Sequence, residues 1–195
     1  MATRDLTAAL PPVFSYTDAR ERGLSDRDLQ VLQGRGRIEK IARGLFSSSD
    51  LYADPDLLEI AFRSKRSTLC LTSALARHGL TDEIPATIDI AVPRGTRPPR
   101  TSAPVTWHRF NSDTFDLGRE MIDIGAGCEI GLYSPERSIC DAFRLRHHEG
   151  AVLATDALKR WLRRPGTQPS KLLAMATVLG PKAAAPLRTA LEKLL

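Results

Sequence analysis

Residues 14–46, FSYTDARERGLSDRDLQVLQGRGRIEKIARGLF, decide how the start of this chain folds. The stretch contains two S-x-x-D sequences, at residues 15–18 and 25–28. In such a capping box the serine oxygen accepts a backbone N–H of the first helical turn, and the carboxylate lies near the positive end of the helix. The two helix starts are only ten residues apart, so the first helix must be short, and Gly23 suits the left-handed residue that ends it. The spacing predicts a helix-turn-helix.

The pattern changes after this second helix. Gly34 and Gly36 end it, and residues 38–46 then contain apolar residues among polar ones, with a tight turn predicted at Arg43-Gly44. A two-stranded hairpin that directly follows a helix-turn-helix makes a winged helix. The predicted core of this unit consists of Phe14, Ala19, Leu24, Leu29, Leu32, Ile38 and Ile41.

The same stretch carries a surface suited to DNA. If the second helix begins at Asp26, its leucines turn inward, and Arg27, Gln30 and Gln33 share the outer face. Arg and Gln form paired hydrogen bonds with guanine and adenine, and basic residues of the wing suit phosphate or minor-groove contact. The alternatives are a solvated basic face or a helix-turn-helix that binds protein. The predicted DNA-binding residues are Arg20, Arg27, Gln30, Gln33, Arg35, Arg37, Lys40 and Arg43.

Composition supports an ordinary soluble, globular protein in a reducing cytoplasm. Hydrophobic residues make up 42% of the 195 residues and charged residues 26%, and neither a membrane-spanning run nor a secretory leader is expected. The three cysteines are far apart, which argues against a disulfide framework and a zinc ribbon. The net charge of +5 favours an anionic partner. Both ends of the chain are basic, whereas residues 48–134 carry nine Lys and Arg against twelve Asp and Glu.

The rest of the chain predicts a second, mixed domain. We expect a winged-helix domain over residues 1–50, including a short leading helix at 3–10, and an α/β (α+β) domain over 51–195. Proline-led and capped helices, two alternating strands and a hairpin predict a small sheet covered by helices. The expected elements after residue 50 are helices capped by Asp54 and Thr72, strands 87–92 and 105–110, a hairpin around 125–127, and helices capped by Ser134, at 151–163, at 169–179 and at 184–195. The side chains expected to face inward from these helices include Phe62, Ile139, Cys140, Phe143 and Val152.

No motif in the sequence indicates catalysis, a metal or a cofactor. Asp89 and Asp123 lie on predicted strands, which invites comparison with metal-dependent nucleases. Such chemistry normally uses a carboxylate followed two residues later by lysine, and no Glu-x-Lys or Asp-x-Lys occurs. The nucleophile elbow, the phosphate-binding loop and the dinucleotide fingerprint are also missing. We therefore expect a protein that is not an enzyme, with no catalytic residue, no metal ligand and no cofactor.

The basic C-terminal helices have two interpretations. They extend the DNA surface or dock an acidic partner, or they are ordinary solvated helix faces. The residues concerned are Arg144, Arg146, Lys159, Arg160, Arg163 and Arg164.

Taken together, the chain resembles the AbiEi-type antitoxins of bacterial toxin–antitoxin operons, whose partner toxin is a nucleotidyltransferase. Three stretches, in the same order, carry the resemblance. They are GLSDRDLQVLQGRGRIEKIARGLF in the winged helix, LTSALARHGLTDEIPATIDIAVP, and YSPERSICDAFRLR.

The resemblance implies a winged helix that binds and represses the promoter of its own operon, and a C-terminal domain that counteracts the toxin. Direct complex formation and indirect antagonism both remain open, as does the oligomeric state, for which a dimer on DNA is one option. The alternatives are a stand-alone winged-helix transcription factor and, with less support, a DNA-targeted nuclease.

Overall fold

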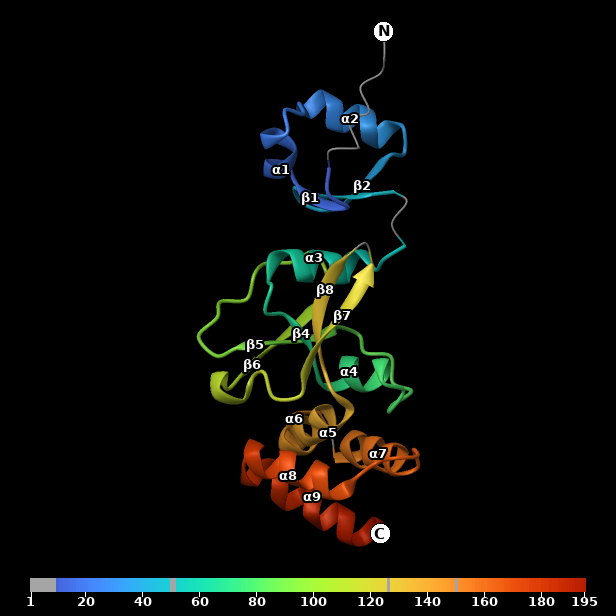
Figure 1. Ribbon diagram of the computed structural model, residues 1–195, viewed down its shortest axis with the longest axis vertical. Helices are drawn as coiled ribbons and strands as arrows, with labels where there is room; N and C mark the ends of the chain where they lie inside the picture. The colour runs from blue at the N-terminus through green and yellow to red at the C-terminus, as the bar shows by residue number, and fades with distance from the viewer. Residues whose placement is uncertain (1–9, 50–51, 126, 150) are drawn as a thin grey trace. The chain divides into compact units, whose positions relative to one another are not determined.

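The computed structural model describes residues 10–49, 52–125, 127–149 and 151–195. Apart from Leu10, the leading helix expected at 3–10 lies outside this described part, and so do residues 50 and 51, where the expected domain boundary falls. The described strands form a three-stranded and a five-stranded sheet, and helices occur along the whole chain (Figure 1). The predicted α/β class is confirmed.

The chain divides by its internal contacts into two compact units. The first unit comprises the chain up to Lys65, together with Pro99–Pro104 and Asp123–Ile130. The second comprises Arg66–Pro98, Val105–Ile122 and Gly131–Leu195. The helix that starts after Asp54 therefore groups with the N-terminal residues, and independent folding of residues 1–50 stays a prediction.

The winged-helix segment, residues 13–48, has the predicted short helices and hairpin. Its elements are β1 (Val13–Ser15), α1 (Tyr16–Glu21), α2 (Asp26–Gly34), β2 (Ile38–Ala42) and β3 (Leu45–Ser48). The strands form an antiparallel sheet in the order β1-β3-β2, and Figure 1 shows α1 and α2 on one side of it. Strand β1 was not predicted, because three residues carry no period of their own and its partner strand is about 30 residues away.

The side of this sheet that faces the helices holds most of the predicted core. Phe14 and Phe46 stack with ring centroids 5.6 Å apart, and the inward side chains of both helices pack with them. Ile41 was wrongly assigned to this core and is only half buried. The register of β2 against β3 shifts between Lys40 and Ala42, so Ile41 is the extra residue of a bulge.

The opposite side of the same sheet is also buried. Val13, Ala42, Leu45 and Ser47 are each less than 8% exposed. Their burial is explained within the first unit by α3 (Pro55–Arg63), which contacts β2. A sheet covered on both sides needs apolar residues on both faces, and for this reason we consider α3 part of the folding unit.

The five-stranded sheet has the strand order β6-β5-β4-β8-β7. Its strands are β4 (Thr68–Leu69), β5 (Ile88–Pro93), β6 (Val105–Phe110), β7 (Arg119–Gly125) and β8 (Cys128–Tyr133). All except β4 were predicted. This central strand has only two residues, which pair antiparallel with β5 and parallel with β8, and so tertiary pairing alone defines it.

The helices after β3 follow the expected pattern with shifted ends. Asp54 caps α3 by accepting the N–H groups of Asp56 and Leu57, but Phe62, expected in its buried stripe, is 43% exposed. Thr72 does not cap α4, because the N-cap residue is Cys70, two residues earlier. The remaining helices are α4 (Leu71–Arg77), the short 3-10 helix η1 (Ser112–Thr114), α5 (Pro135–Arg144), α6 (Arg146–Glu149), α7 (Ala151–Leu162), α8 (Pro169–Leu179) and α9 (Pro181–Leu194).

The helical core of the second unit lies among α4, α5, α7, α8 and α9. Figure 1 shows α5, α7, α8 and α9 gathered at the C-terminal end. Ile139, Cys140 and Phe143 of α5 are buried here, as predicted. Val152, expected on the apolar face of α7, is instead 73% exposed.

A buried ion pair holds α5 to the turn before β7. Arg137 is 1% exposed, and its Nε donates to Oδ2 of Asp141 over 2.8 Å. Its NH1 donates to the carbonyl oxygens of Thr114 and Leu117, over 2.6 and 2.7 Å, and its guanidinium lies 4.4 Å from the ring centroid of Tyr133. Burial, the dominant cause, raises the pKa of Tyr133 far above its usual value. Nε and NH1 of Arg137 thus donate three hydrogen bonds, and a buried charge requires such partners.

We expect Asp141→Asn to destabilise the second unit by about 3–5 kcal/mol, because it leaves the buried Arg137 without its counter-charge. Urea unfolding followed by circular dichroism measures this loss. The matched control is Asp156→Asn, since Asp156 is 54% exposed and forms a surface pair with Lys159, a type of pair that contributes about 0–1 kcal/mol. Equal effects of the two substitutions would show that the buried pair does not stabilise the fold.

Candidate nucleic-acid interface

Both helices of the winged-helix segment begin at the predicted capping boxes. The amide of Asp18 donates to Ser15 Oγ over 3.0 Å, and the amide of Ser15 donates to Oδ2 of Asp18 over 2.7 Å. The corresponding distances between Asp28 and Ser25 are 3.2 and 2.8 Å. Hydrogen bonds from the serine hydroxyl and then from the serine amide lower the pKa of each aspartate. The two boxes fix where each helix starts and therefore which side chains face outward.

The turn between the helices needs a left-handed residue. Gly23 has φ of +82°, and its amide donates to the carbonyl oxygen of Arg20. The amide of Leu24 donates to the carbonyl oxygen of Ala19. These hydrogen bonds end α1, and α2 begins a few residues later.

The outer face of α2 carries the predicted base-reading residues. Arg27, Gln30 and Gln33 are exposed, while Leu29 and Leu32 point into the core. At about 100° per residue, Arg27 and Gln30 are neighbours on this face, and Gln33 lies toward its margin. Val31, which was not predicted, is 40% exposed beside Arg27. An exposed valine next to Arg and Gln suits contact with the methyl group of thymine.

Arg20, in the last turn of α1, belongs to a small polar cluster with the first residues of α1 and α2, Tyr16 and Asp26. Its NH1 lies 3.8 Å from Asp26 Oδ1, and its guanidinium lies 5.8 Å from the ring centroid of Tyr16. The Tyr16 hydroxyl also donates to Asp26, and this hydrogen bond raises the pKa of Tyr16. Arg20 and Asp26 are more than half exposed, so the pair is weak and leaves Arg20 available to phosphate.

The predicted wing residues fall at opposite ends of the hairpin. Arg35 and Arg37 lie in the connection between α2 and β2, and the Arg37 carbonyl accepts the amide of Ser49 at the open end of the hairpin. Arg43 lies at the closed end, in the two-residue turn before β3. With a rise of about 3.3 Å per residue, the five residues of β2 separate the two ends by roughly 17 Å. Arg37 and Arg43 could therefore contact only different phosphates, and Arg35 and Arg37 are not on the wing itself.

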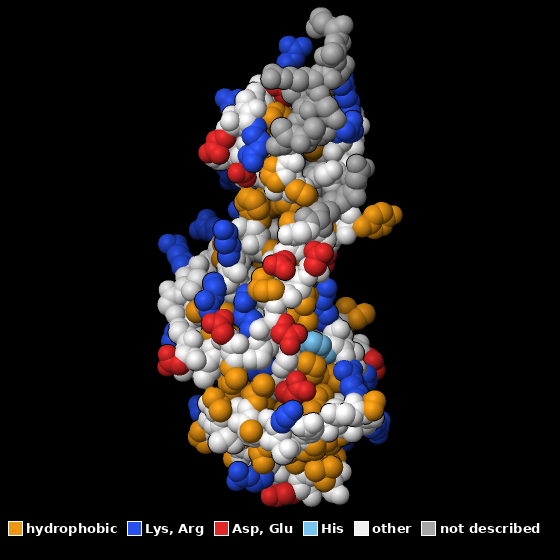
Figure 2. Space-filling model, viewed as in Figure 1, with side chains coloured by type: hydrophobic (Ala, Val, Ile, Leu, Met, Phe, Trp, Pro, Cys, Tyr) orange, Lys and Arg blue, Asp and Glu red, His pale blue; other side chains and the backbone are white. Residues whose placement is uncertain are grey.

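Lys40 lies on the same face of the sheet as the helices. It pairs with Phe46, whose side chain is in the core beneath α1 and α2, and directly paired residues project from the same face. Because β2 is an edge strand, Lys40 stays exposed. In Figure 2, Lys and Arg side chains on this segment stand among Asp and Glu side chains, so the surface visible there is not of one sign.

Most of the basic residues in the C-terminal helices have partners. Arg160 pairs with Asp82, Lys159 with Asp156, and Arg164 donates to the carbonyl oxygen of His78. Fewer of the six basic residues named for the C-terminal helices are therefore available to an external partner than the sequence suggested.

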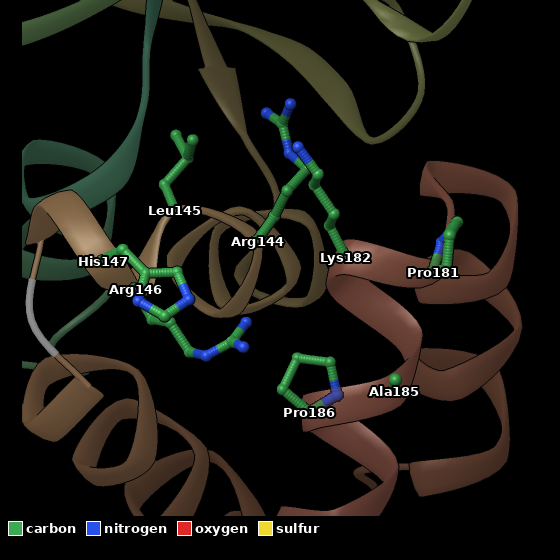
Figure 3. Close-up of a pocket in the computed structure, with 8 residues that line it drawn as sticks. All are labelled: Arg144, Leu145, Arg146, His147, Pro181, Lys182, Ala185 and Pro186. Atoms are coloured by element: carbon green, nitrogen blue, oxygen red, sulfur yellow. The ribbon is translucent and has the colours of Figure 1, made fainter.

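A second basic region is the pocket of about 390 Å³ shown in Figure 3. Arg144, Arg146 and His147 line one side of it, and the start of α9, including Lys182, lines the other. Nε and NH2 of Arg144 both donate to Oδ1 of Asp141, over 3.1 and 2.8 Å, and NH1 of Arg146 donates to the carbonyl oxygen of Phe143. Much of the positive charge around this pocket is therefore already engaged by acceptors within the second unit.

Across the described residues, no group of three or more His, Cys, Asp and Glu could hold a metal ion. Asp89 Oδ1 lies 2.9 Å from His108 Nε2 on the neighbouring strand, a pairing that sequence reasoning missed because the two residues are 19 positions apart. Asp123 accepts the amide of Gly125 two residues later. Cys70, Cys128 and Cys140 are not in disulfide bonds. Of the helices in the described ranges, none is long and apolar enough to cross a bilayer.

Comparison with known families identifies the N-terminal part. Residues 1–48 match a family described as "Transcriptional regulator, AbiEi antitoxin". The matched residues include the whole winged-helix segment, both capping boxes and the hairpin. The resemblance to AbiEi-type antitoxins is confirmed over these residues, which are similar to the regulators of that family. Comparison with curated proteins gave no match.

The capping carboxylates should make the winged-helix segment sensitive to acid. A carboxylate whose pKa is lowered by folding stabilises the fold above its unfolded pKa of about 3.9, and this stabilisation is lost as the pH falls through the lower folded pKa. We expect Asp28→Asn to lower stability at pH 7 and to reduce the decline in stability between pH 5 and pH 3. Thermal unfolding monitored by circular dichroism tests this, with Glu39→Gln on the exposed face of β2 as control. Parallel pH curves for the wild type and Asp28→Asn would contradict the expectation.

The exposed face of α2 should discriminate between DNA sequences. Replacing Arg27 or Gln30 by alanine should cost about 1–3 kcal/mol of binding to the operator and much less on random DNA, because only base contacts depend on sequence. Titrations of labelled duplexes at fixed salt measure both values. Equal losses on the two duplexes would show that α2 does not read bases.

Proposed function

We propose that this chain, whose residues 1–48 match the AbiEi antitoxin regulators, binds the promoter DNA of its own operon and represses transcription. We further propose that it counteracts a nucleotidyltransferase toxin encoded with it. Its action requires binding and no catalysis. The carrying observation is that the matched residues fold as two capped short helices and a hairpin, with Arg27, Gln30 and Val31 exposed on α2.

The DNA-binding half of the proposal is supported by side-chain chemistry. A helix that presents Arg and Gln outward offers donors and acceptors for the major groove, where each base pair has its own pattern. Arg20, Lys40 and Arg43, exposed on other elements of the segment, suit contacts with phosphates, which position a protein on DNA without reading sequence. Arg37 and Arg43 lie at the two ends of β2, roughly 17 Å apart, and this separation suits an extended DNA backbone better than a single small anion.

The antitoxin half is supported by the second unit. This unit has its own helical core and its own buried ion pair, and neither involves the winged-helix segment. The toxin partner comes from the resemblance to the family. We propose that this unit neutralises the toxin and that the first unit binds DNA.

The two activities should be separable by mutation in the full chain. A variant with Arg27, Gln30 and Arg43 all changed to alanine should lose promoter repression but still rescue cells that express the toxin from an unrelated promoter. Phe143→Ala removes a side chain that is 4% exposed, at a cost of about 3–5 kcal/mol. This variant should lose rescue, because the second unit unfolds, while the winged-helix segment still binds DNA. A reporter gene measures repression, and growth measures rescue.

Two outcomes would decide against this division of labour. If the triple alanine variant is folded but fails to rescue, neutralisation requires the DNA-binding face. If no reading frame for a nucleotidyltransferase lies beside this gene and the chain still represses its promoter, the chain is a stand-alone transcription factor. Val152→Ala, at an exposed position of α7, is the matched control for Phe143→Ala and should leave both activities unchanged.

A further inference from the structure

Glu59 is a buried carboxylate to which sequence reasoning gave no role. It is 1% exposed on α3, and its Oε2 accepts the amides of Ser102 and Ala103 over 2.8 and 3.1 Å. Its Oε1 accepts Nε of Arg63 over 2.7 Å. A buried carboxylate needs such partners, and here two of them belong to a loop more than 40 residues away in sequence. Glu59 therefore fixes the loop Pro99–Pro104 to α3 within the first unit.

Arg63 extends this connection to the hairpin. While its Nε binds Glu59, its NH2 donates to the carbonyl oxygen of Arg43 over 3.2 Å. The turn between β2 and β3 and the loop Pro99–Pro104 are thus attached to the same ion pair, one through Arg63 and the other through Glu59. All of these residues belong to the first unit.

A pocket of about 430 Å³ lies where these three elements meet. The charges of Glu59 and Arg63 offset each other, because the two side chains form an ion pair. Arg43 and Arg100 remain, both exposed, and in the described ranges their guanidinium groups have no hydrogen bond or ion pair. The lining residues are Arg43, Gly44, Glu59, Arg63, Arg100, Thr101 and Ser102.

We propose that Arg43 and Arg100 together hold one backbone phosphate of the bound DNA. The proposal rests on the DNA-binding function proposed above and adds to it a contact from outside the winged-helix segment. Guanidinium groups bind phosphate through paired hydrogen bonds, and two of them around one pocket provide the charge that a phosphate needs. The pocket adjoins the hairpin turn, so a DNA strand that contacts the wing is the anion nearest to it.

Glu59 and Arg63 act as positioning residues in this arrangement. Without Glu59, the amides of Ser102 and Ala103 would lose the hydrogen bonds that hold the loop to α3, and Arg100 would lose its place beside Arg43. Phosphate contacts carry no sequence information, so this pocket should add affinity and orientation equally on every DNA sequence.

The test is a salt titration of binding by the full chain. Fluorescence anisotropy is measured with two labelled probes of equal length, a 40-base-pair duplex from directly upstream of the gene and a duplex of random sequence. We expect the double variant Arg43→Ala/Arg100→Ala to reduce the slope of log K against log salt by about 0.9 on both probes, as expected when one phosphate contact is lost. Each single variant should reduce it less, because one guanidinium remains at the phosphate.

Arg97→Ala is the matched control. Arg97 is exposed three residues before Arg100 and its loss removes the same charge as Arg100→Ala, but it does not line the pocket. We expect its salt slope to equal that of the wild type. Glu59→Gln should weaken binding in the chain that has Arg100 and should have no further effect in the Arg100→Ala chain, a dependence that general destabilisation would not produce.

The possible failures are distinguishable. If the wild type binds neither probe, the proposed function and this inference are both overturned. If the wild type binds and the double variant keeps the salt slope of Arg97→Ala, only the phosphate site is overturned. If the double variant binds DNA normally but no longer rescues cells from the toxin, the pocket serves an acidic protein partner and the inference is wrong.

Discussion

The winged-helix segment depends on two serine–aspartate capping boxes placed ten residues apart. Each box satisfies backbone N–H groups that a helix start would otherwise leave without partners, and each brings a negative charge to the positive helix end. Since both helix starts are fixed, α1 has room for only six residues, and the register of α2 follows. That register turns Leu29 and Leu32 into the core and Arg27 and Gln30 outward. The proposed reading face is thus a consequence of hydrogen bonds at the start of α2.

Buried carboxylates have the corresponding role where long-range connections are made. Glu59 binds two loop amides and Arg63, and Asp141 binds Arg137, which in turn binds two carbonyl oxygens of the turn before β7. In both cases one charged pair on a helix binds backbone groups of a segment that is distant in sequence. Such pairs cost desolvation energy and give geometric definition, because each needs its partners in a fixed place. The first defines the surface beside the hairpin turn, and the second lies within the unit that we propose neutralises the toxin.

The structure also limits what the basic charge of the chain means. The net charge of +5 suggested an anionic partner, and the C-terminal helices supplied much of it. In the folded chain Arg144, Lys159 and Arg160 are bound to carboxylates of their own unit. The arginines with no such partner among the described residues include Arg43 and Arg100, which sequence places 57 residues apart and the fold places around one pocket. The location of unpaired charge therefore indicates the partner better than the total does.

The sequence by itself determined the local features: both capped helices, the glycine turn, the hairpin and four of the five strands in the larger sheet. These follow from hydrogen bonds and periodicities within a few residues of chain. Only the tertiary structure decided β1 and β4, the bulge that moves Ile41 out of the core, and the burial of the second face of the small sheet. The same holds for the site. Spacing predicted the exposure of Arg27 and Gln30, but the grouping of Arg43 with Arg100 depends on Glu59 and Arg63, whose partners are 20 to 44 residues away. Contacts at that separation leave no periodic trace in a sequence.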